Sequence, residues 1–142
     1  MIKYPIEFHS RTEAACGLSR NWQTLSQDRH TEVSVPKEFL GPGSGLSPED
    51  LYNHALTNCF VATFQVYAEN SKLSFESLKV ESKLIVDVDE RKRPVMKEFF
   101  LSATIQAPNN SEKALLLARK ASESGFILNS VKTICHFDFK VS

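Results

Sequence analysis

The sequence predicts an α+β fold, because strand and helix signals follow one another in the order strands, long helix, strand hairpin, helix, strand. Two segments carry helix start signals, and two long runs between them alternate apolar and polar residues with the period of a strand. No regular strand–helix–strand alternation is visible, which argues against an α/β fold. At 142 residues, of which 42% are hydrophobic, the chain is expected to form one packed domain over residues 1–142.

The N-terminal part of the chain predicts short strands joined by turns. Apolar and polar residues alternate over residues 2–9, the pattern of a half-buried strand. Pro5 favours an edge position for this strand, because proline donates no backbone hydrogen bond. Weaker strand signals follow at residues 14–18, 21–25 and 31–35.

A long helix is expected directly after a glycine-rich loop. Residues 41–45 hold three of the five glycines of the chain and predict irregular structure. Ser47 suits the N-cap, Pro48 suits the first helical position, and two acidic residues then complement the helix dipole. The helix should end at residue 68 or 70. Because residues 55–64 are apolar or small on nearly all sides, this helix is expected to be central to the fold.

The second half of the chain predicts an antiparallel hairpin, a helix and a final strand. Alternating patterns over residues 78–89 and 95–107 are separated by a charged turn at residues 90–94. Ser111 and the acidic residue after it start a second helix, which should end near residue 123. In the final strand, residues 131–141, Thr133, Cys135 and the following odd-numbered residues should face one side.

The composition argues against two classes of partner. Lys plus Arg number 17 and Asp plus Glu number 17, so the formal net charge is zero, whereas nucleic-acid binders are usually basic. The basic run at residues 91–93 lies beside acidic residues at a hairpin tip and is typical of a solvated turn. No stretch has the roughly 18 consecutive apolar residues of a membrane span, and residues 1–9 lack the apolar core of a secretory signal. A cytoplasmic protein without nucleic-acid or membrane partners is expected.

The cysteines and histidines predict neither a metal site nor a cofactor. Three widely spaced cysteines and four histidines show no ligand spacing, and the odd cysteine count does not form a disulfide framework. Cys135 lies on the apolar face of a strand, where a cysteine usually acts as a small hydrophobic residue. Cys16 lies in the least regular part of the chain and is undecided.

Residue spacing alone makes Cys59 a core residue in the middle of the long helix. A reactive thiolate needs a nearby cation or a helix N-terminus, and Cys59 is about three turns from that terminus. His54, five positions earlier, lies about 140° around the helix and cannot pair with Cys59 locally.

The segment from Ser47 to Phe60 resembles the signature of the OsmC/Ohr family, in which an Asn-Pro-Glu-Glu-Leu-type helix start is followed, ten residues after the Glu, by an Ala-Cys-Phe-type segment. The glycine-rich loop, hairpin, second helix and final strand also occur in family order. The resemblance implies two central helices wrapped by antiparallel sheets, in an intertwined homodimer with active sites at its interface. It also implies reduction of organic hydroperoxides by a peroxidatic cysteine.

The functional residues of the family carry over in part. Cys59 matches the peroxidatic cysteine, and Glu49 matches the glutamate that orients an arginine. One family placement of that arginine falls near Arg20, with a shift of two or three residues, and the other falls near Lys37. Arg20 is the better match, because a lysine does not offer the forked guanidinium that can hold a carboxylate.

The resolving cysteine of the family corresponds to Gly125 in this sequence. Without that thiol, a sulfenic acid on Cys59 would be reduced by a small external thiol, or by Cys16 or Cys135 if the fold brings one of them close. The resemblance therefore implies a one-cysteine variant of the chemistry.

Three functions stay open at this point. The first is a homodimeric, thiol-dependent hydroperoxide peroxidase without a cofactor or metal. The second is a non-catalytic dimer that binds a hydrophobic small molecule in an interfacial pocket, and the third is a structural module in which Cys59 is merely packed. The predicted pocket residues are Tyr52, Leu56, Phe60 and Phe126.

Overall fold

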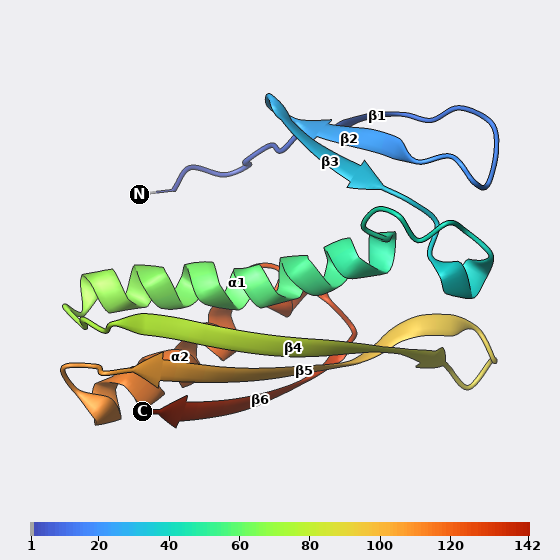
Figure 1. The fold of residues 1–142 in the computed structure, drawn as a ribbon. Coiled ribbons are helices and arrows are strands. Elements are labelled where there is room, and N and C mark those ends of the chain that lie inside the picture. Colours follow the sequence, from blue (N-terminus) through green and yellow to red (C-terminus); the bar gives the residue numbers. More distant parts are fainter. Residues whose placement is uncertain (1) are drawn as a thin grey trace. The chain divides into compact units, whose positions relative to one another are not determined.

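The computed structural model describes residues 2–142, in which the chain forms two compact units, Met1–Leu51 and Tyr52–Ser142. The first unit contains strands β1 to β3, and the second contains strands β4 to β6 with most of α1 and all of α2 (Figure 1). The α+β fold class predicted from the sequence is confirmed.

The described part of the first unit is built on a three-stranded antiparallel sheet. Its strands are β1 (Arg11–Glu13), β2 (Trp22–Ser26) and β3 (Arg29–Val33), in the order β1-β2-β3. The strands predicted at residues 21–25 and 31–35 are thus confirmed with small shifts. A short 3-10 helix, η1 (Lys37–Phe39), follows, and the predicted loop at residues 41–45 then leads to Leu46, which bridges to Val33.

Two predicted strands are not formed. Residues 14–18 make the bend and turn between β1 and β2, where Gly17 has a φ of 127° that residues with a side chain rarely adopt. Residues 2–9 are exposed throughout and have no strand partner in the described structure, although their alternation predicted a half-buried strand. Alternation marks a segment that suits a sheet, but a strand also needs a neighbour with free backbone groups.

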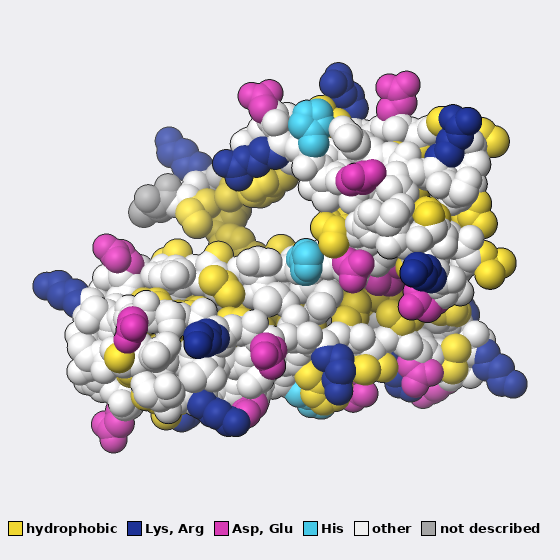
Figure 2. Space-filling view, in the orientation of Figure 1, with side chains coloured by type: hydrophobic (Ala, Val, Ile, Leu, Met, Phe, Trp, Pro, Cys, Tyr) yellow, Lys and Arg dark blue, Asp and Glu magenta, His cyan; other side chains and the backbone are white. Residues whose placement is uncertain are grey.

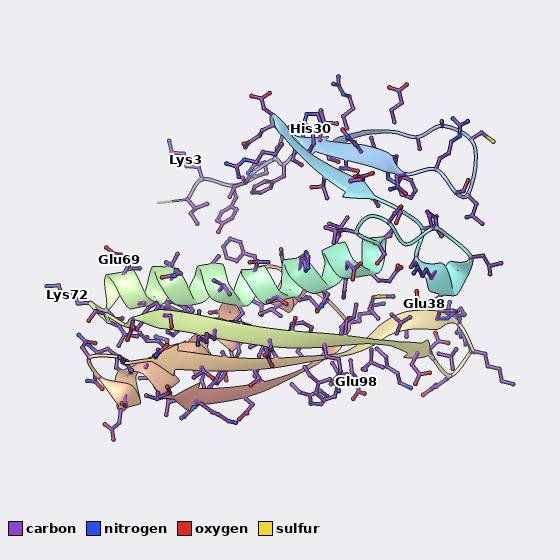
Figure 3. All side chains as sticks on the ribbon, viewed as in Figure 1. Lys3, His30, Glu38, Glu69, Lys72 and Glu98 are labelled. Atoms are coloured by element: carbon purple, nitrogen blue, oxygen red, sulfur yellow. The ribbon has the colours of Figure 1, made fainter. Side chains whose placement is uncertain are left out.

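Helix α1 (Pro48–Asn70) begins as predicted. The Ser47 hydroxyl accepts a hydrogen bond from the Asp50 backbone N–H, and the Asp50 carboxylate accepts one from the Ser47 N–H, each at 3.0 Å. This reciprocal pair is a capping box, which satisfies two backbone donors at the helix start. The other end is labelled by Glu69 and Lys72 in Figure 3; there Lys72 takes a left-handed φ of 55° and ends the helix.

The second unit contains one sheet in the order β4-β5-β6. β4 (Ser77–Val88) and β5 (Pro94–Gln106) form the predicted antiparallel hairpin. Helix α2 (Ser111–Ser124) follows, with the Asn110 side chain accepting a hydrogen bond from the Lys113 N–H as its N-cap. A short 3-10 helix, η2 (Leu128–Ser130), leads to β6 (Ile134–Val141), which begins three residues later than predicted.

The prediction that the sheets are antiparallel is wrong for one pair of strands, because β6 runs parallel to β5. Helix α2 runs back along the sheet after β5, so the chain re-enters the sheet at the end where β5 began. β5, α2 and β6 therefore form a strand–helix–strand unit, which the sequence pattern did not reveal.

Both helices and one face of this sheet share a hydrophobic core. Phe60 of α1 stacks on Phe139 of β6, with ring centroids 5.4 Å apart, and on Phe64 at 6.1 Å. One of the two alternating faces of β5 is buried, and so is one side of α2. The buried side chains are Phe99, Leu101, Ala103 and Ile105 of β5 and Ala114, Leu117, Ala118 and Ala121 of α2. The core thus fixes α1 and α2 against the sheet.

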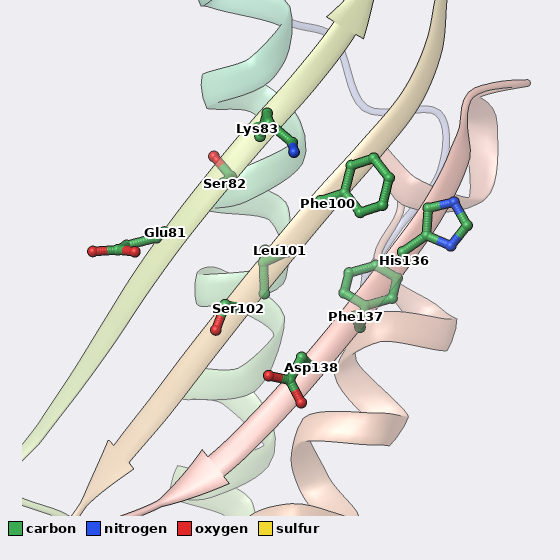
Figure 4. Close-up of a pocket in the computed structure, with 9 residues that line it drawn as sticks. All are labelled: Glu81, Ser82, Lys83, Phe100, Leu101, Ser102, His136, Phe137 and Asp138. Carbon is green, nitrogen blue, oxygen red and sulfur yellow. The ribbon is translucent and has the colours of Figure 1, made fainter.

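The opposite face of the sheet carries a shallow hollow of about 400 Å³ (Figure 4). Lys83, Phe100 and His136 lie in one row across the three strands. The Phe100 ring stacks on His136 at 4.6 Å, and the Lys83 Nζ lies 4.9 Å from the Phe100 centroid. His136 Nε2 also lies 3.2 Å from Glu98 Oε1. These contacts tie the three strands together on their solvent side.

The surface shows no single-sign patch on the side drawn in Figure 2, where acidic and basic side chains are interspersed. This agrees with the equal numbers of acidic and basic residues in the sequence. No helix within residues 2–142 combines the length and the apolar character needed to cross a membrane.

Candidate functional site

Cys59 lies in α1, on the side where the end of α2 packs against it. Its side chain is buried, with 9% of its surface exposed. A Cβ atom on Gly125, the residue that ends α2, would lie 2.6 Å from the Cys59 Sγ. The same point is 3.3 Å from Leu128 Cδ1 and 3.4 Å from Thr63 Oγ1. The Cys59 sulfur therefore packs directly on the backbone of Gly125.

Thr63 is fixed beside this contact by the helix itself. Its hydroxyl donates to the Cys59 carbonyl oxygen at 2.7 Å, one turn earlier. This bond holds the Thr63 side chain in one rotamer, next to Gly125. The i, i+4 spacing from Cys59 could have identified Thr63 from the sequence. Leu128 could not have been found in this way, because its place depends on the path of the chain between α2 and β6.

All three cysteines are free thiols. Cys135, in β6, is half-buried, and burial raises the pKa of its thiol, so the thiolate is disfavoured there. Its S–H donates to the Thr133 carbonyl oxygen at 3.5 Å. Cys16 is exposed in the first unit, whereas Cys59 and Cys135 belong to the second.

Glu49 is the second residue of α1, and one of its carboxylate oxygens lacks a partner. Oε1 is buried and has no hydrogen bond from any residue between 2 and 142. A buried carboxylate oxygen without a donor costs free energy, so this atom is suited to a cationic partner.

Arg20 lies in the first unit, in the turn that precedes β2. Its backbone N–H donates to the Gly17 carbonyl at 3.2 Å, and the side-chain carbons lie over Gly17. Its guanidinium forms no ion pair with a carboxylate of the described residues. Lys37, the other candidate for this role, is exposed in η1. The roles of both residues stay predictions.

The predicted pocket residues lie in different surroundings. Leu56 and Phe60 are wholly buried in the core, with 0% exposure. The Tyr52 hydroxyl lies 2.6 Å from Thr133 Oγ1 and is engaged in a structural hydrogen bond. Phe126 is 62% exposed and directly follows Gly125. The structure therefore brings Cys59, Gly125 and Phe126 to the end of α2.

No group of three or more His, Cys, Asp or Glu side chains within residues 2–142 is arranged to hold a metal ion.

The sequence profile described as "OsmC-like protein" matches residues 41–140, which include Cys59, Gly125 and the whole second unit apart from its last two residues. The chain belongs to the OsmC-like protein family. The matched region begins at the glycine-rich loop and includes both residues whose contact defines the candidate site.

Solved structures with the same fold include an OsmC-like protein of unknown function from Vibrio cholerae, with a TM-score of 0.84 and 16% identity over 95% of this chain and 99% of that one. An organic hydroperoxide resistance protein from Elizabethkingia anophelis has a TM-score of 0.74 and 20% identity, with 99% of both chains covered. An organic hydroperoxide resistance protein, OsmC, from Legionella pneumophila has a TM-score of 0.70 and 19% identity, again with 99% of both covered. At these identities the similarity establishes a shared OsmC-like fold.

A relative with higher sequence identity is YmaD of Bacillus subtilis (strain 168), itself an uncharacterized protein. It is 40% identical over 58 residues, which are 41% of this chain and 39% of YmaD. The aligned part of the chain thus spans about two fifths of this relative.

Proposed function

We infer that this OsmC-like protein is a thiol-dependent reductase of organic hydroperoxides, with Cys59 as its single working thiol. The observation that carries this proposal is the contact between Cys59 and Gly125. The two positions that the OsmC/Ohr resemblance assigns to the peroxidatic and resolving cysteines lie against each other, and only one of them holds a sulfur.

The proposed chemistry begins with attack of the Cys59 thiolate on one peroxide oxygen. An S–O bond forms, the O–O bond breaks, and the leaving alkoxide takes a proton to become an alcohol. A small thiol then attacks the sulfenic acid to give a mixed disulfide and water. A second thiol then attacks the mixed disulfide, which releases the Cys59 thiol and joins the two external thiols in a disulfide. The external thiols supply the two electrons that the peroxide removes.

The thiolate needs a cation nearby, and Arg20 is the proposed source. A guanidinium stays charged at all relevant pH values and lowers the pKa of a neighbouring thiol. Glu49 would hold this arginine, and its buried, unpartnered Oε1 supports that role, since it has the capacity to accept such a bond.

The protein is proposed to act as an intertwined homodimer. Residues 2–9 alternate like a strand but lack a partner among the described residues, and Phe8 is 93% exposed. A second copy of the chain can supply the missing neighbour, because exchange of identical segments closes a symmetric pair. Phe126, exposed beside Gly125, is proposed to contact the apolar part of the hydroperoxide.

A cytoplasmic location suits this chemistry, since a working free thiol needs a reducing compartment. The alternative of a non-catalytic dimer that binds a hydrophobic molecule is not favoured. Leu56 and Phe60, which were predicted to line a small-molecule pocket, are completely inside the core, and neither is proposed to contact a ligand.

The proposal is tested by turnover of cumene hydroperoxide with a small dithiol as reductant. Wild type should consume peroxide. In Cys59→Ser the rate should fall at least about 100-fold, because the attacking nucleophile is removed. Cys135→Ser is the matched control and should retain activity. Equal turnover in wild type and Cys59→Ser would refute the proposal.

A further inference from the structure

The residue type that fits at position 125 is limited by the Cys59 sulfur and not by the backbone conformation of residue 125. Gly125 has φ −65° and ψ 137°, an ordinary extended conformation that any residue adopts. The constraint is space: a Cβ here would lie 2.6 Å from the Cys59 Sγ, much closer than two atoms that are not bonded to each other approach.

Two further side chains bound the space that this Cβ would enter. Leu128 Cδ1 and Thr63 Oγ1 lie 3.3 and 3.4 Å from the same Cβ position. Thr63 is held by its hydrogen bond to the Cys59 carbonyl, so it cannot swing aside without losing that bond. We call the position of the Cys59 thiol against the bare backbone of Gly125 its seat.

We propose that Gly125 is a positioning residue for Cys59: the missing side chain lets the thiol occupy this seat, and a side chain at position 125 that does not bond to the sulfur displaces it toward solvent. The meaning of this role for catalysis rests on the proposed function. The steric coupling itself does not, since it concerns the position of the thiol and can be measured without turnover.

The direction of the effect follows from the geometry. In a helix, a cysteine has two main χ1 rotamers, so a thiol that is expelled from one well moves to the other. With the sulfur in this seat, residue 59 is only 9% exposed. Loss of the seat is therefore expected to make the thiol more accessible.

The first test is a double-mutant cycle on thermal unfolding with Gly125→Ala and Cys59→Ala. Gly125→Ala alone should lower Tm by about 5 °C or more, as expected when a tightly packed site is overfilled. In the Cys59→Ala background the same change should cost little or nothing, because the clashing sulfur is gone. If Gly125→Ala fails to fold while the double variant folds, that rescue supports the proposal equally. An equal loss in both backgrounds, or no loss in either, overturns it.

The second test is the alkylation rate of each cysteine with iodoacetamide, followed by peptide mass spectrometry. In Gly125→Ala, labelling of Cys59 should become at least about five-fold faster, the rate change that corresponds to about 1 kcal/mol in the free energy of exposing the thiol. Labelling of Cys135 should be unchanged, and Ser122→Ala, in the last turn of α2, is the matched control. Unchanged or slower labelling of Cys59 overturns the proposal. If the coupling is found but Cys59→Ser retains full peroxidase activity, the proposed function fails and the positioning role stands.

Discussion

The Tyr52 hydroxyl of α1 lies 2.6 Å from Thr133 Oγ1, and Thr133 in turn donates to the Met96 carbonyl oxygen at 2.7 Å. Because the Thr133 proton is used by Met96, Tyr52 must donate to Thr133. This relay connects α1, the start of β5 and the residue that precedes β6. It is partly shielded from water, so each of its hydrogen bonds is stronger than it would be at the surface.

Tyr52→Phe should destabilise the protein by about 1 kcal/mol, the usual net contribution of one such hydrogen bond. Thr133→Val should cost more, because it leaves both the Tyr52 hydroxyl and the Met96 carbonyl without this partner. Urea unfolding of the two variants and their combination checks this prediction. The double variant should cost hardly more than Thr133→Val, whereas fully additive losses would contradict the relay.

Gly125→Cys is expected to form a disulfide with Cys59. The separation of 2.6 Å between the position of the Gly125 Cβ and the Cys59 Sγ is too short for atoms that are not bonded. In a disulfide the Cβ of one cysteine lies about 3 Å from the Sγ of the other, so only a small shift is needed to form the bond. Thiol titration after treatment with peroxide should show two fewer free thiols than in the reduced variant. The combination of Gly125→Cys with Cys59→Ser is the control, and full retention of free thiols in Gly125→Cys would contradict the prediction.

Cys135 should be a slow nucleophile near neutral pH. Burial raises the pKa of its thiol above the ordinary value of a cysteine, so the reactive thiolate is a small fraction at pH 7 and grows only at alkaline pH. The alkylation rate of Cys135, followed in a Cys16→Ser/Cys59→Ser variant, should therefore still be rising above pH 9.0. A rate that reaches its plateau near pH 8 would contradict this assignment.

Charged substitutions in residues 2–9 should weaken the proposed homodimer. Ile6→Asp combined with Phe8→Asp places two carboxylates where the dimer would bury apolar side chains, so the dissociation constant should rise at least about ten-fold. Light scattering coupled to size-exclusion chromatography measures the change. Leu116→Asp, at an exposed apolar position of α2, is the matched control. A monomeric wild type would refute the dimer, and a dimer unaffected by the double substitution would exclude this segment from its interface.

The parts of the fold that were predicted from sequence depend on local signals. Ser47 and Pro48 marked the start of α1, and alternation marked the hairpin and the buried face of β5. The parallel pairing of β6 was missed because it depends on the path of the chain through α2 and not on any residue within β6.

For the candidate site, the residues and their geometry were predictable to different degrees. The resemblance singled out Cys59 and Gly125, but it could not show that the thiol rests on the glycine backbone. That contact joins residues far apart in sequence and depends on how α2 packs on α1. The strand expected at residues 2–9 failed for a related reason: alternation describes a segment, whereas pairing also requires a second one.

The connection between α2 and β6, residues 125–133, has a fixed length for two unrelated reasons. At one end Gly125 meets the Cys59 sulfur, and at the other Thr133 anchors Tyr52. Between them the chain is held by bonds from the Asn129 N–H to the Gly125 carbonyl and from the Ser130 N–H to the Ile127 carbonyl, both 2.9 Å. An inserted or deleted residue would shift one end relative to the other. The exposed residues between Gly125 and Thr133 are therefore expected to vary in type among functional variants of the chain, whereas the length of the connection is not.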